Sequence, residues 1–394
     1  MSFLDIYLGR NGNETLGDLP VSAQDKDKTD HWEDMMETES TMLDLLTVPA
    51  FTVESGTIAY ANRAAQDAML CVGDPVEPLL VTGQQELAAM KSGSLFLTMK
   101  LMGKPREASV HAHGADRIFV VEQEDMDSDL QLLTLAASKL REPLNDVMML
   151  TDQMFPGLME SENPELRRQM AQMNRGLFRI LRTVGNMSDA GEFLALDREL
   201  QMEPTELCSF FAEVAEKAEN LTGGAGVEVQ YLCPPADLVA MADRAKLERA
   251  AYNLLSNALK FTPPGGHIQV ELKKRGNLAV FRVTDDGEGI PDDILGTVYA
   301  RFRREPSPGD TRWGIGLGLP LVRRTAAFHG GSLLLYRTPE GGTAAAMTIR
   351  LREVRGDKVS APVLRVDYTG EHDHGLVEMA DCLPWQAFEP GDIN

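Results

Sequence analysis

The stretch Asn253–Thr262 reads NLLSNALKFT, and its spacing decides how the surrounding chain folds. Asn253, Asn257 and Lys260 are separated by four and three positions, which places their side chains on one face of an α-helix. The apolar residues between them face elsewhere, toward a core. Two carboxamides and one ammonium group on a single face suit a hydrated Mg²⁺ and a polyphosphate, because amide oxygens ligate the metal or its waters while lysine supplies positive charge.

An acidic segment with two glycines follows this helix. Residues 283–291 read VTDDGEGIP, and they continue an expected hydrophobic strand at 278–283. Asp285 is placed to accept a hydrogen bond from an exocyclic amine such as that of adenine. Gly287 and Gly289 allow the backbone to approach a ring closely.

Two further motifs come later in the chain. Residues 301–304, RFRR, form a basic and aromatic patch in an expected loop, and residues 314–319, GIGLGL, precede an expected helix that continues to about Phe328. Glycines expose backbone N–H groups, and a helix N-terminus adds a favourable field for phosphate. The glycine motif is not a Walker P-loop, because no GK[ST] ends it.

These four motifs, in this order and spacing, resemble the N, G1, F and G2 boxes of sensor histidine kinases. Those kinases belong to the GHKL ATPases, which also include Hsp90-like and MutL-like proteins. The strings NLLSNALKFTPPGG and GIGLGLPLVRR are similar to the kinase branch in particular. The resemblance implies that residues 200–353 form an α/β-sandwich ATP-binding domain of the Bergerat type, with ATP and Mg²⁺ as cofactors.

The resemblance also implies roles at the metal and the phosphates. Asn257 would be the principal Mg²⁺ ligand, with Asn253 supporting it, and Lys260 would contact the phosphates. Arg304 would reach the γ-phosphate from a loop that faces a partner. The two preceding arginines of that motif are interpreted as surface residues that aid solubility.

A second set of implied roles concerns the base and the lid over the triphosphate. Asp285 would read adenine, in a pocket shaped by Gly287 and Gly289. The hinges of the lid would come from the fourth motif. The nucleotide-binding residues implied there are Gly314, Gly316, Gly318 and Leu319.

Residues 127–193 are expected to form a helical hairpin, with helices at about 128–154 and 165–190. The break between them contains Pro156, Gly157 and Pro164. Apolar residues of the second helix recur at alternating steps of four and three, which is the pattern of a coiled coil or a bundle. Two such helices do not bury their apolar stripes alone. We therefore expect an antiparallel hairpin that forms a homodimeric four-helix bundle.

The first helix departs from the family at the site of chemistry. Sensor histidine kinases carry a phospho-accepting histidine and then an acidic residue there, in a string similar to SHELRTPL. Residues 137–144 read ASKLREPL instead, with Ser138 at the histidine position and Lys139 at the acidic one. A serine hydroxyl needs a base to remove its proton, and no histidine lies on either expected helix. Self-phosphorylation on histidine is therefore not expected.

Three explanations of this departure stay open. In the first, the protein is a non-catalytic, ATP-binding scaffold that regulates a partner kinase or a response regulator. In the second, it phosphorylates a histidine on a partner protein. In the third, Ser138 itself accepts the phosphoryl group. The retained nucleotide motifs favour a phosphotransferase of the histidine kinase family acting in a two-component pathway. The missing histidine favours the scaffold.

The chain before the hairpin has a mixed α/β pattern over residues 41–125. Two strands, a helix capped by Asn62 and three later strands resemble a PAS sensory domain; the alternative is an α+β domain without a ligand. The strands are expected at 50–53, 57–60, 95–101, 107–113 and 117–123. Residues 1–40 are interpreted as a loosely ordered leader, and residues 354–394 as an extension with an added strand and helix of unassigned function.

Composition limits the protein's class and location. A formal net charge of −22 would repel nucleic acid, so no nucleic-acid partner is expected. No signal peptide and no run of about 18 apolar residues is visible, so we expect a cytoplasmic protein without a membrane span. The cysteines lie far apart in sequence, which indicates neither a zinc site nor a redox pair and fits a reducing cytoplasm. They are Cys71, Cys208, Cys233 and Cys382. Together these features predict an α+β multidomain protein.

Overall fold

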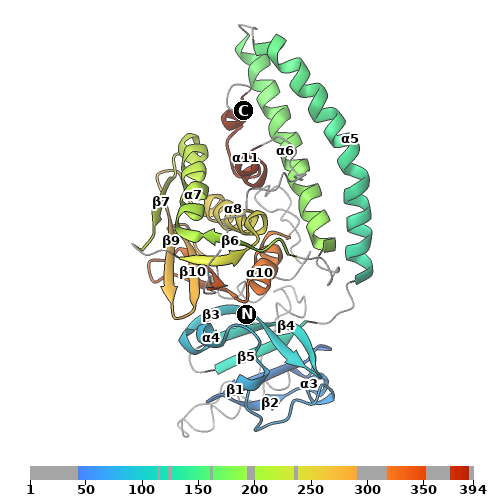
Figure 1. The fold of residues 1–394 in the computed structure, drawn as a ribbon, viewed down its shortest axis with the longest axis vertical. Coiled ribbons are helices and arrows are strands. Elements are labelled where there is room, and N and C mark those ends of the chain that lie inside the picture. Colours follow the sequence, from blue (N-terminus) through green and yellow to red (C-terminus); the bar gives the residue numbers. More distant parts are fainter. Residues whose placement is uncertain are drawn as a thin grey trace, which may run out of the picture. The chain divides into compact units, whose positions relative to one another are not determined.

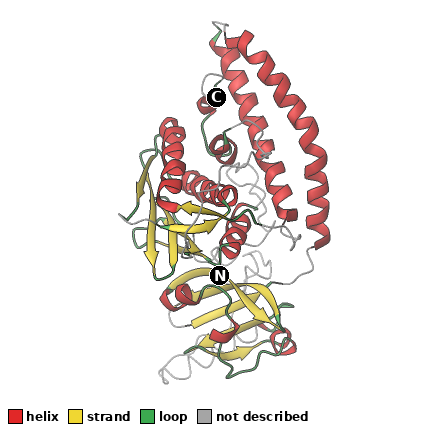
Figure 2. Cartoon of the chain, in the orientation of Figure 1, coloured by secondary structure: helices red, strands yellow, loops and turns green. Residues whose placement is uncertain are grey.

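The computed structural model describes residues 43–113, 116–122, 127–159, 163–192, 200–234, 238–290, 317–351 and 373–389. The chain divides into two compact units (Figures 1 and 2). The first consists mainly of the chain up to Gln123, and the second contains the helical hairpin, the region of the four motifs and the C-terminal segment. The expected leader at 1–40 lies outside the described residues.

The first unit is an antiparallel sheet with the strand order β2-β1-β5-β4-β3. All five expected strands are confirmed, although β3 and β4 each begin three residues earlier than expected. The rings of Phe51 and Phe119 stack in its core with centroids 4.8 Å apart. The elements are β1 (Ala50–Glu54), β2 (Thr57–Ala61), α3 (Arg63–Asp67), η1 (Glu77–Leu79), α4 (Gln84–Ala89), β3 (Ser92–Leu101), β4 (Lys104–His113) and β5 (Asp116–Val121).

Asn62 is the N-cap of α3, as its sequence position predicts. Its Oδ1 accepts hydrogen bonds from Ala65 N at 2.9 Å and from Ala50 N at 3.0 Å. Its Nδ2 donates to three carbonyls of the segment around the start of β1, those of Leu43, Leu46 and Val48. One fully buried carboxamide therefore joins the helix start, the first strand and the chain that leads into it.

The hairpin consists of α5 (Asp127–Met159) and α6 (Pro164–Glu192), which lie side by side (Figure 1). The expected break at Pro156 and Gly157 is wrong, because α5 continues through both residues to Met159. Pro156 falls in the last turn, where a missing N–H removes one hydrogen bond close to the helix end. Pro164 begins α6, the position at which proline is favoured.

The region of the four motifs has a sheet in which β12 (Thr343–Arg350), β10 (Leu278–Asp285), β9 (His267–Arg275) and β7 (Glu228–Leu232) are neighbours. The β7–β9 pair is parallel and the other two pairs are antiparallel. β11 (Leu333–Arg337) leads into β12 through a turn closed by Thr338 N and Gly342 O. β6 (Glu203–Glu206) and β8 (Val239–Ala242) form a separate pair.

Three helices pack against this sheet: α7 (Leu207–Thr222), α8 (Arg244–Phe261) and α10 (Gly318–Phe328). The rings of Phe211 on α7 and Phe281 on β10 stack at 4.1 Å between centroids, so the core lies between helices and strands. A short helix, η2 (Gly223–Ala225), follows α7. This arrangement confirms a mixed helix and sheet domain over the motif region.

Cys208 and Cys233 form a disulfide between the start of α7 and the end of β7, with Cα atoms 6.0 Å apart. The wide sequence spacing of the cysteines was interpreted as indicating no redox pair, and this disulfide was therefore not predicted. The fold brings together two residues that are 25 positions apart in sequence. Short cysteine motifs such as CxxC do not predict a pair at that separation.

The C-terminal segment contributes α11 (His374–Met379) and η3 (Trp385–Phe388). α11 contacts α6, α7 and α8, and η3 contacts α6 (Figure 1). The expected added helix is thus confirmed, whereas the expected strand falls outside the described residues. Within the part of the chain that the structure describes, no helix is both long and apolar enough to cross a membrane.

Candidate nucleotide site

The first motif lies on α8, as predicted. Asp243 begins this helix, and its carboxylate accepts hydrogen bonds from Lys246 N and Gln201 N, each at 3.2 Å. An N-cap carboxylate satisfies free amides and complements the positive helix end. Lys260 lies in the last turn, where a cation complements the opposite end of the helix. The helix that carries the motif is therefore stabilised by favourable charges at both of its ends.

Asn253 is buried and already bonded within the protein. Its Nδ2 donates to Arg249 O at 2.9 Å and to Glu378 Oε2 at 3.3 Å, and its Oδ1 accepts from Arg182 Nη2 at 3.2 Å. Only 1% of the residue is exposed. Asn253 therefore holds α8 to α6 and to the C-terminal segment. Asn257, one turn later, is half-buried.

Lys260 faces the same C-terminal segment as Asn253, which confirms the shared helix face. Its Nζ lies 3.6 Å from Asp381 Oδ2. Burial raises the pKa of the Asp381 carboxyl, but the nearby Arg182 and Lys260 outweigh that effect and hold it below its usual range. The carboxylate of Asp381 is thus ionised beside the ammonium of Lys260.

Asp285 lies at the end of β10, where the sequence predicts it. Its Oδ1 accepts hydrogen bonds from Gly287 N at 3.1 Å and from Thr343 N at 3.2 Å. The residue is 7% exposed, and burial raises its pKa while the two backbone N–H groups act in the opposite direction. These two bonds fix the orientation of the carboxylate at the edge of the domain core.

Gly287 and Gly289 bring chain segments together closely. A Cβ on Gly287 would overlap Phe261 O at the end of α8, and a Cβ on Gly289 would overlap Gly341 O in the turn before β12. Gly289 also has a φ of +73°, which disfavours other residues. The sequence predicts that the backbone at these glycines approaches a ring closely. In the structure, the groups that it approaches are the carbonyls of Phe261 and Gly341.

The fourth motif is described only at its end. Gly318 begins α10, and a Cβ on it would lie 2.7 Å from Asn253 Oδ1, so the first turn of α10 contacts the first motif. Leu319 follows it and is half-buried. The remaining implied residues, Gly314, Gly316 and Arg304, lie outside the described residues, as do Arg301 and Arg303.

His329 links the ends of the two helices that carry these motifs. Its Nε2 accepts a hydrogen bond from Asp243 N at 3.0 Å, and its Nδ1 donates to Thr325 O at 2.7 Å. These bonds place the ring proton on Nδ1, and burial lowers the pKa of His329. His329 is therefore both the C-cap of α10 and a direct contact of the residue that begins α8.

A buried ionic cluster around Glu378, which the sequence did not predict, lies next to the first motif. Arg249 Nε donates to Glu378 Oε1 at 2.8 Å, and Arg182 Nη1 lies 2.9 Å from Asp381 Oδ2. Arg249 also pairs with Asp189 on α6. A signal for this contact exists in α6, where buried residues recur every four positions on a second, partly polar face. They are Asn174, Phe178, Arg182 and Asn186.

Ser138, at the expected acceptor position, is exposed on α5. Its hydroxyl donates a hydrogen bond to Leu135 O of the same helix at 2.8 Å. Lys139 beside it is also exposed. This bond uses the hydroxyl proton and supplies no base that would remove it.

Comparison with known proteins identifies the domain that carries these motifs. Residues 242–354 match the family described as histidine kinase-, DNA gyrase B- and HSP90-like ATPase. The chain is 27% identical over 242 residues to the sensor histidine kinase WalK of Bacillus subtilis, covering 60% of this chain and 39% of WalK. It is 29% identical over 258 residues to the adaptive-response sensory kinase SasA of Synechococcus sp., covering 63% of this chain and 65% of SasA.

Among solved structures, the chain is similar to full-length ShkA in complex with AMPPNP, with a TM-score of 0.47 and 21% identity. That match covers 56% of this chain and 46% of ShkA. The chain spans less than two thirds of the length of WalK, SasA and ShkA alike. The family match over the motif region and the similarity to sensor kinases lead to one conclusion. Residues 242–354 belong to the family of histidine kinase-, DNA gyrase B- and HSP90-like ATPases, and the chain is similar to sensor histidine kinases.

Proposed function

We propose that this protein is a MgATP-binding signalling protein of a two-component system that transfers the γ-phosphoryl group to a protein partner. The observation that carries the proposal is the fixed carboxylate of Asp285. Two backbone amides, of Gly287 and Thr343, orient it beside the end of the helix that carries Asn257 and Lys260. A rigid acceptor next to carboxamides and an ammonium matches the needs of an adenine nucleotide.

The donor set fits a magnesium ion held mainly by phosphate and amide oxygens. No group of three or more acidic, histidine or cysteine side chains with metal-ligand geometry occurs among the described residues. Mg²⁺ commonly uses few protein ligands and keeps waters and phosphate oxygens instead. We assign Asn257 as the principal ligand. Asn253 supports it once its Oδ1 is released from Arg182 Nη2. When bound, the ion would neutralise phosphate charge.

The remaining residues of the proposed site contact the phosphates and the adenine base. We assign Lys260 to the phosphates and Asp285 Oδ2 to the exocyclic amine of adenine, while Gly287 and Gly289 keep the neighbouring backbone close. The lid residues Gly314, Gly316, Gly318 and Leu319, and Arg304 at the γ-phosphate, complete the proposed site.

Transfer to a separate protein fits the acceptor position better than transfer within the chain. Ser138 donates its proton to a helix carbonyl, and its neighbour Lys139 is a cation rather than a base. A histidine on a heterodimer partner or on another protein is a stronger nucleophile near neutral pH than this hydroxyl. The proposed partners are therefore a response regulator or a partner kinase.

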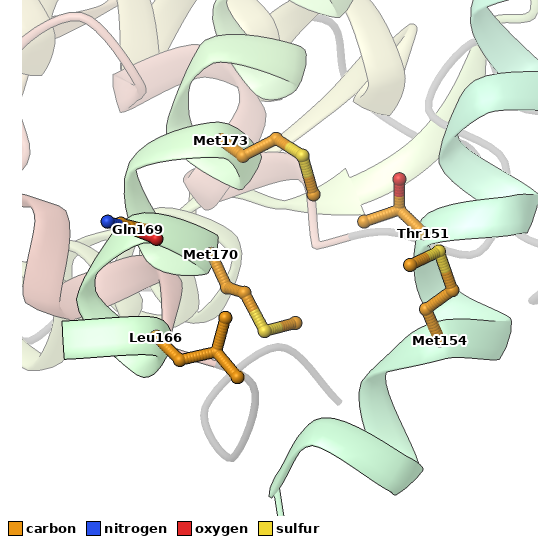
Figure 3. Close-up of a pocket in the computed structure, with 6 residues that line it drawn as sticks. All are labelled: Thr151, Met154, Leu166, Gln169, Met170 and Met173. Carbon is orange, nitrogen blue, oxygen red and sulfur yellow. The ribbon is translucent and has the colours of Figure 1, made fainter. Parts of the chain in front are cut away.

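The hairpin supports a proposed homodimer through residues 127–193. Large apolar side chains on both helices are about half exposed, among them Leu140 and Val147 on α5 and Ile180 on α6. Figure 3 shows Met170 and Met173 of α6 extending toward the side of α5 that carries Met154, where they line a pocket. Such apolar faces favour burial in a four-helix bundle.

We propose a PAS-like sensor role for the first unit. Its succession of a strand pair, short helices and three longer strands supports that assignment. A cytoplasmic location stays a prediction from the sequence.

A second function is an ATP-binding scaffold that regulates a partner without transferring phosphate. Two observations favour it. The Ser138 hydroxyl donates its proton to the carbonyl of Leu135, and Asn253 and Lys260 contact the acidic side chains of Glu378 and Asp381. In a scaffold, bound ATP would change how the protein contacts its partner, and no phosphoryl group would be transferred.

One experiment separates the two functions. Purified protein is incubated with Mg²⁺ and γ-labelled ATP, alone and with receiver domains and partner kinases, and the acid lability of any label is measured. Acid-labile label on a partner supports the transferase, and acid-stable label on this chain supports Ser138. Nucleotide binding without transfer in every pairing supports the scaffold.

The nucleotide site itself is tested with matched substitutions. We expect Asn257→Asp and Asp285→Asn each to weaken MgATP binding by about tenfold or more. The first places a negative charge beside the phosphates in place of an amide, and the second replaces the carboxylate that accepts from the adenine amine with a neutral amide. Asn220→Asp, on the exposed side of α7, makes the same chemical change as the first variant away from the site. Unchanged affinity in both site variants would show the assignment to be wrong.

A further inference from the structure

Residues 373–389, here called the strap, pack against the helices of the second unit through their apolar side chains. Its buried residues are almost fully inaccessible, with exposures of 0 or 1%. They are Leu376, Val377, Met379, Ala380, Leu383 and Phe388. The strap begins with an N-cap at Asp373, which accepts a hydrogen bond from Leu376 N at 3.1 Å. It is therefore an ordered element with a specific seat.

One side of the seat is α6. The rings of Phe388 and Phe178 meet edge to face at 5.5 Å between centroids. Arg175 Nη2 donates to Asp381 O at 3.2 Å, and Arg179 Nε lies 3.0 Å from Asp381 Oδ1. The second hairpin helix thus binds the strap through both apolar and charged contacts.

The other side of the seat is the face of α8 that carries the first motif. Glu378 accepts from Asn253, and Asp381 lies beside Lys260. Ser256, between these two positions on α8, has its Oγ 3.5 Å from Cys382 Sγ. The acidic side chains of the strap therefore contact two of the three polar residues in the proposed MgATP site.

We propose that the strap is a built-in competitor of the nucleotide, in which Glu378 and Asp381 occupy Asn253 and Lys260 until the strap shifts. This inference rests on the proposed nucleotide site and adds its regulation. A phosphate oxygen and a carboxylate oxygen seek the same donors, and two anions do not share them without strong repulsion. Nucleotide binding and strap docking are then mutually opposed.

The two carboxylates differ in accessibility, which sets the order of events. The Asp381 side chain is 21% exposed, whereas the Glu378 side chain is fully buried. Phosphates would meet Asp381 first and free Lys260, and complete use of Asn253 would require Glu378 to release its Nδ2 and Arg182 to release its Oδ1. The apparent affinity then scales with the fraction of molecules whose strap is displaced.

A reversible lock tests the competition directly. Ser256→Cys places a second thiol next to Cys382, and mild oxidation joins the strap to α8. We expect the oxidised variant to bind a fluorescent ATP analogue with Mg²⁺ about tenfold more weakly than the same variant after reduction, because a docked strap withholds the site. The wild type under the same oxidation and reduction controls for the Cys208–Cys233 disulfide.

A second pair of variants tests the opposite direction. Neutralising both acids, with Glu378→Gln and Asp381→Asn, is expected to tighten binding of the same analogue about tenfold relative to wild type. Glu389→Gln removes a carboxylate from the strap away from α8 and is expected to leave affinity unchanged. Circular dichroism confirms that each variant is folded before affinity is compared.

The outcomes separate this inference from the proposed function. Affinities that rise from the locked form through wild type to the neutralised form support the competition. Equal affinities in all three overturn it and leave nucleotide binding intact. No binding in any form, the neutralised one included, overturns the proposed nucleotide site and the competition together.

Discussion

Arg249 Nε donates a hydrogen bond to Glu378 Oε1 at 2.8 Å, although 129 positions separate the two residues in the sequence. The carboxylate is fully buried, and its second oxygen accepts from Asn253. One side chain thus joins the end of the chain to the motif that carries the proposed nucleotide chemistry. The contact gives the C-terminal segment a direct influence on that motif.

Removing Glu378 is expected to destabilise the second unit strongly. Glu378→Ala removes the fully buried carboxylate that Arg249 and Arg182 share, and loss of one member of a buried pair typically costs about 3–5 kcal/mol. Urea unfolding followed by tryptophan fluorescence measures the change. Lys217→Ala removes the exposed pair with Asp373 and is expected to cost less than about 1 kcal/mol. Similar losses in the two variants would contradict the importance of burial.

Gly287→Ala is expected to lower both stability and nucleotide affinity. The new methyl group would overlap Phe261 O, and such overpacking commonly costs about 1–3 kcal/mol. A shift of the end of α8 would also displace Asp285, whose Oδ1 binds Gly287 N. Thermal unfolding and nucleotide titration measure the two effects. The control is Gly223→Ala, where an added methyl group meets no atom within 4 Å; an equally large loss there would contradict the overlap.

Stability is expected to fall in mild acid because of His329. Burial lowers its pKa in the folded protein, so below about pH 6.5 the unfolded chain binds a proton that the folded protein does not. The contribution is fully present above that pH and declines as pH falls toward the folded value, at up to about 1.4 kcal/mol per pH unit. Urea unfolding at pH 7.5 and pH 5.5 measures the slope.

The matched comparison for this pH effect is His329→Gln against His267→Gln. The first variant removes a buried imidazole and is expected to reduce the difference between the two pH values. The second removes an exposed imidazole, whose side chain is 67% accessible, and is expected to change the slope little. The same slope in wild type and His329→Gln would contradict the assignment.

In the first unit, Asn62→Ala is expected to cost about 3 kcal/mol. Substitution leaves two backbone amides and three carbonyls without their shared partner, and buried polar groups that lose a partner each carry a penalty. Gln66→Ala removes a side chain with a single bond to Ala61 O and is expected to cost about 1 kcal/mol. Chemical unfolding measures the loss in free energy of unfolding for each variant. Equal losses in the two variants would contradict the role of Asn62.

Local patterns allowed much of the fold to be predicted. The spacing of Asn253 and Lys260 identified a helix face, and the hydrophobic run before Asp285 identified a strand that ends at the proposed site. Asn62 marked a helix start through capping chemistry. These features depend on residues within a few positions of one another, and for that reason the sequence alone reveals them.

Contacts between distant residues were not predicted. Nothing near Asp381 indicates Arg182 as its partner, and the pairing of Cys208 with Cys233 depends on how α7 packs beside β7. In both cases the deciding free energy comes from packing partners far away in the sequence. Pro156 was assigned to a break because its local preference opposes a helix interior, but it lies in the last turn of α5, where few hydrogen bonds are lost.

The strap has a further consequence for the order in which this protein assembles. Arg182 and Asp381 lie 199 positions apart, so their contact closes a very long loop and is expected to form late. Until then the seat between α6 and α8 is uncovered, with Phe178 and the buried arginines facing water. A chain still emerging from the ribosome therefore passes through a stage at which this seat is open to chaperones and to aggregation.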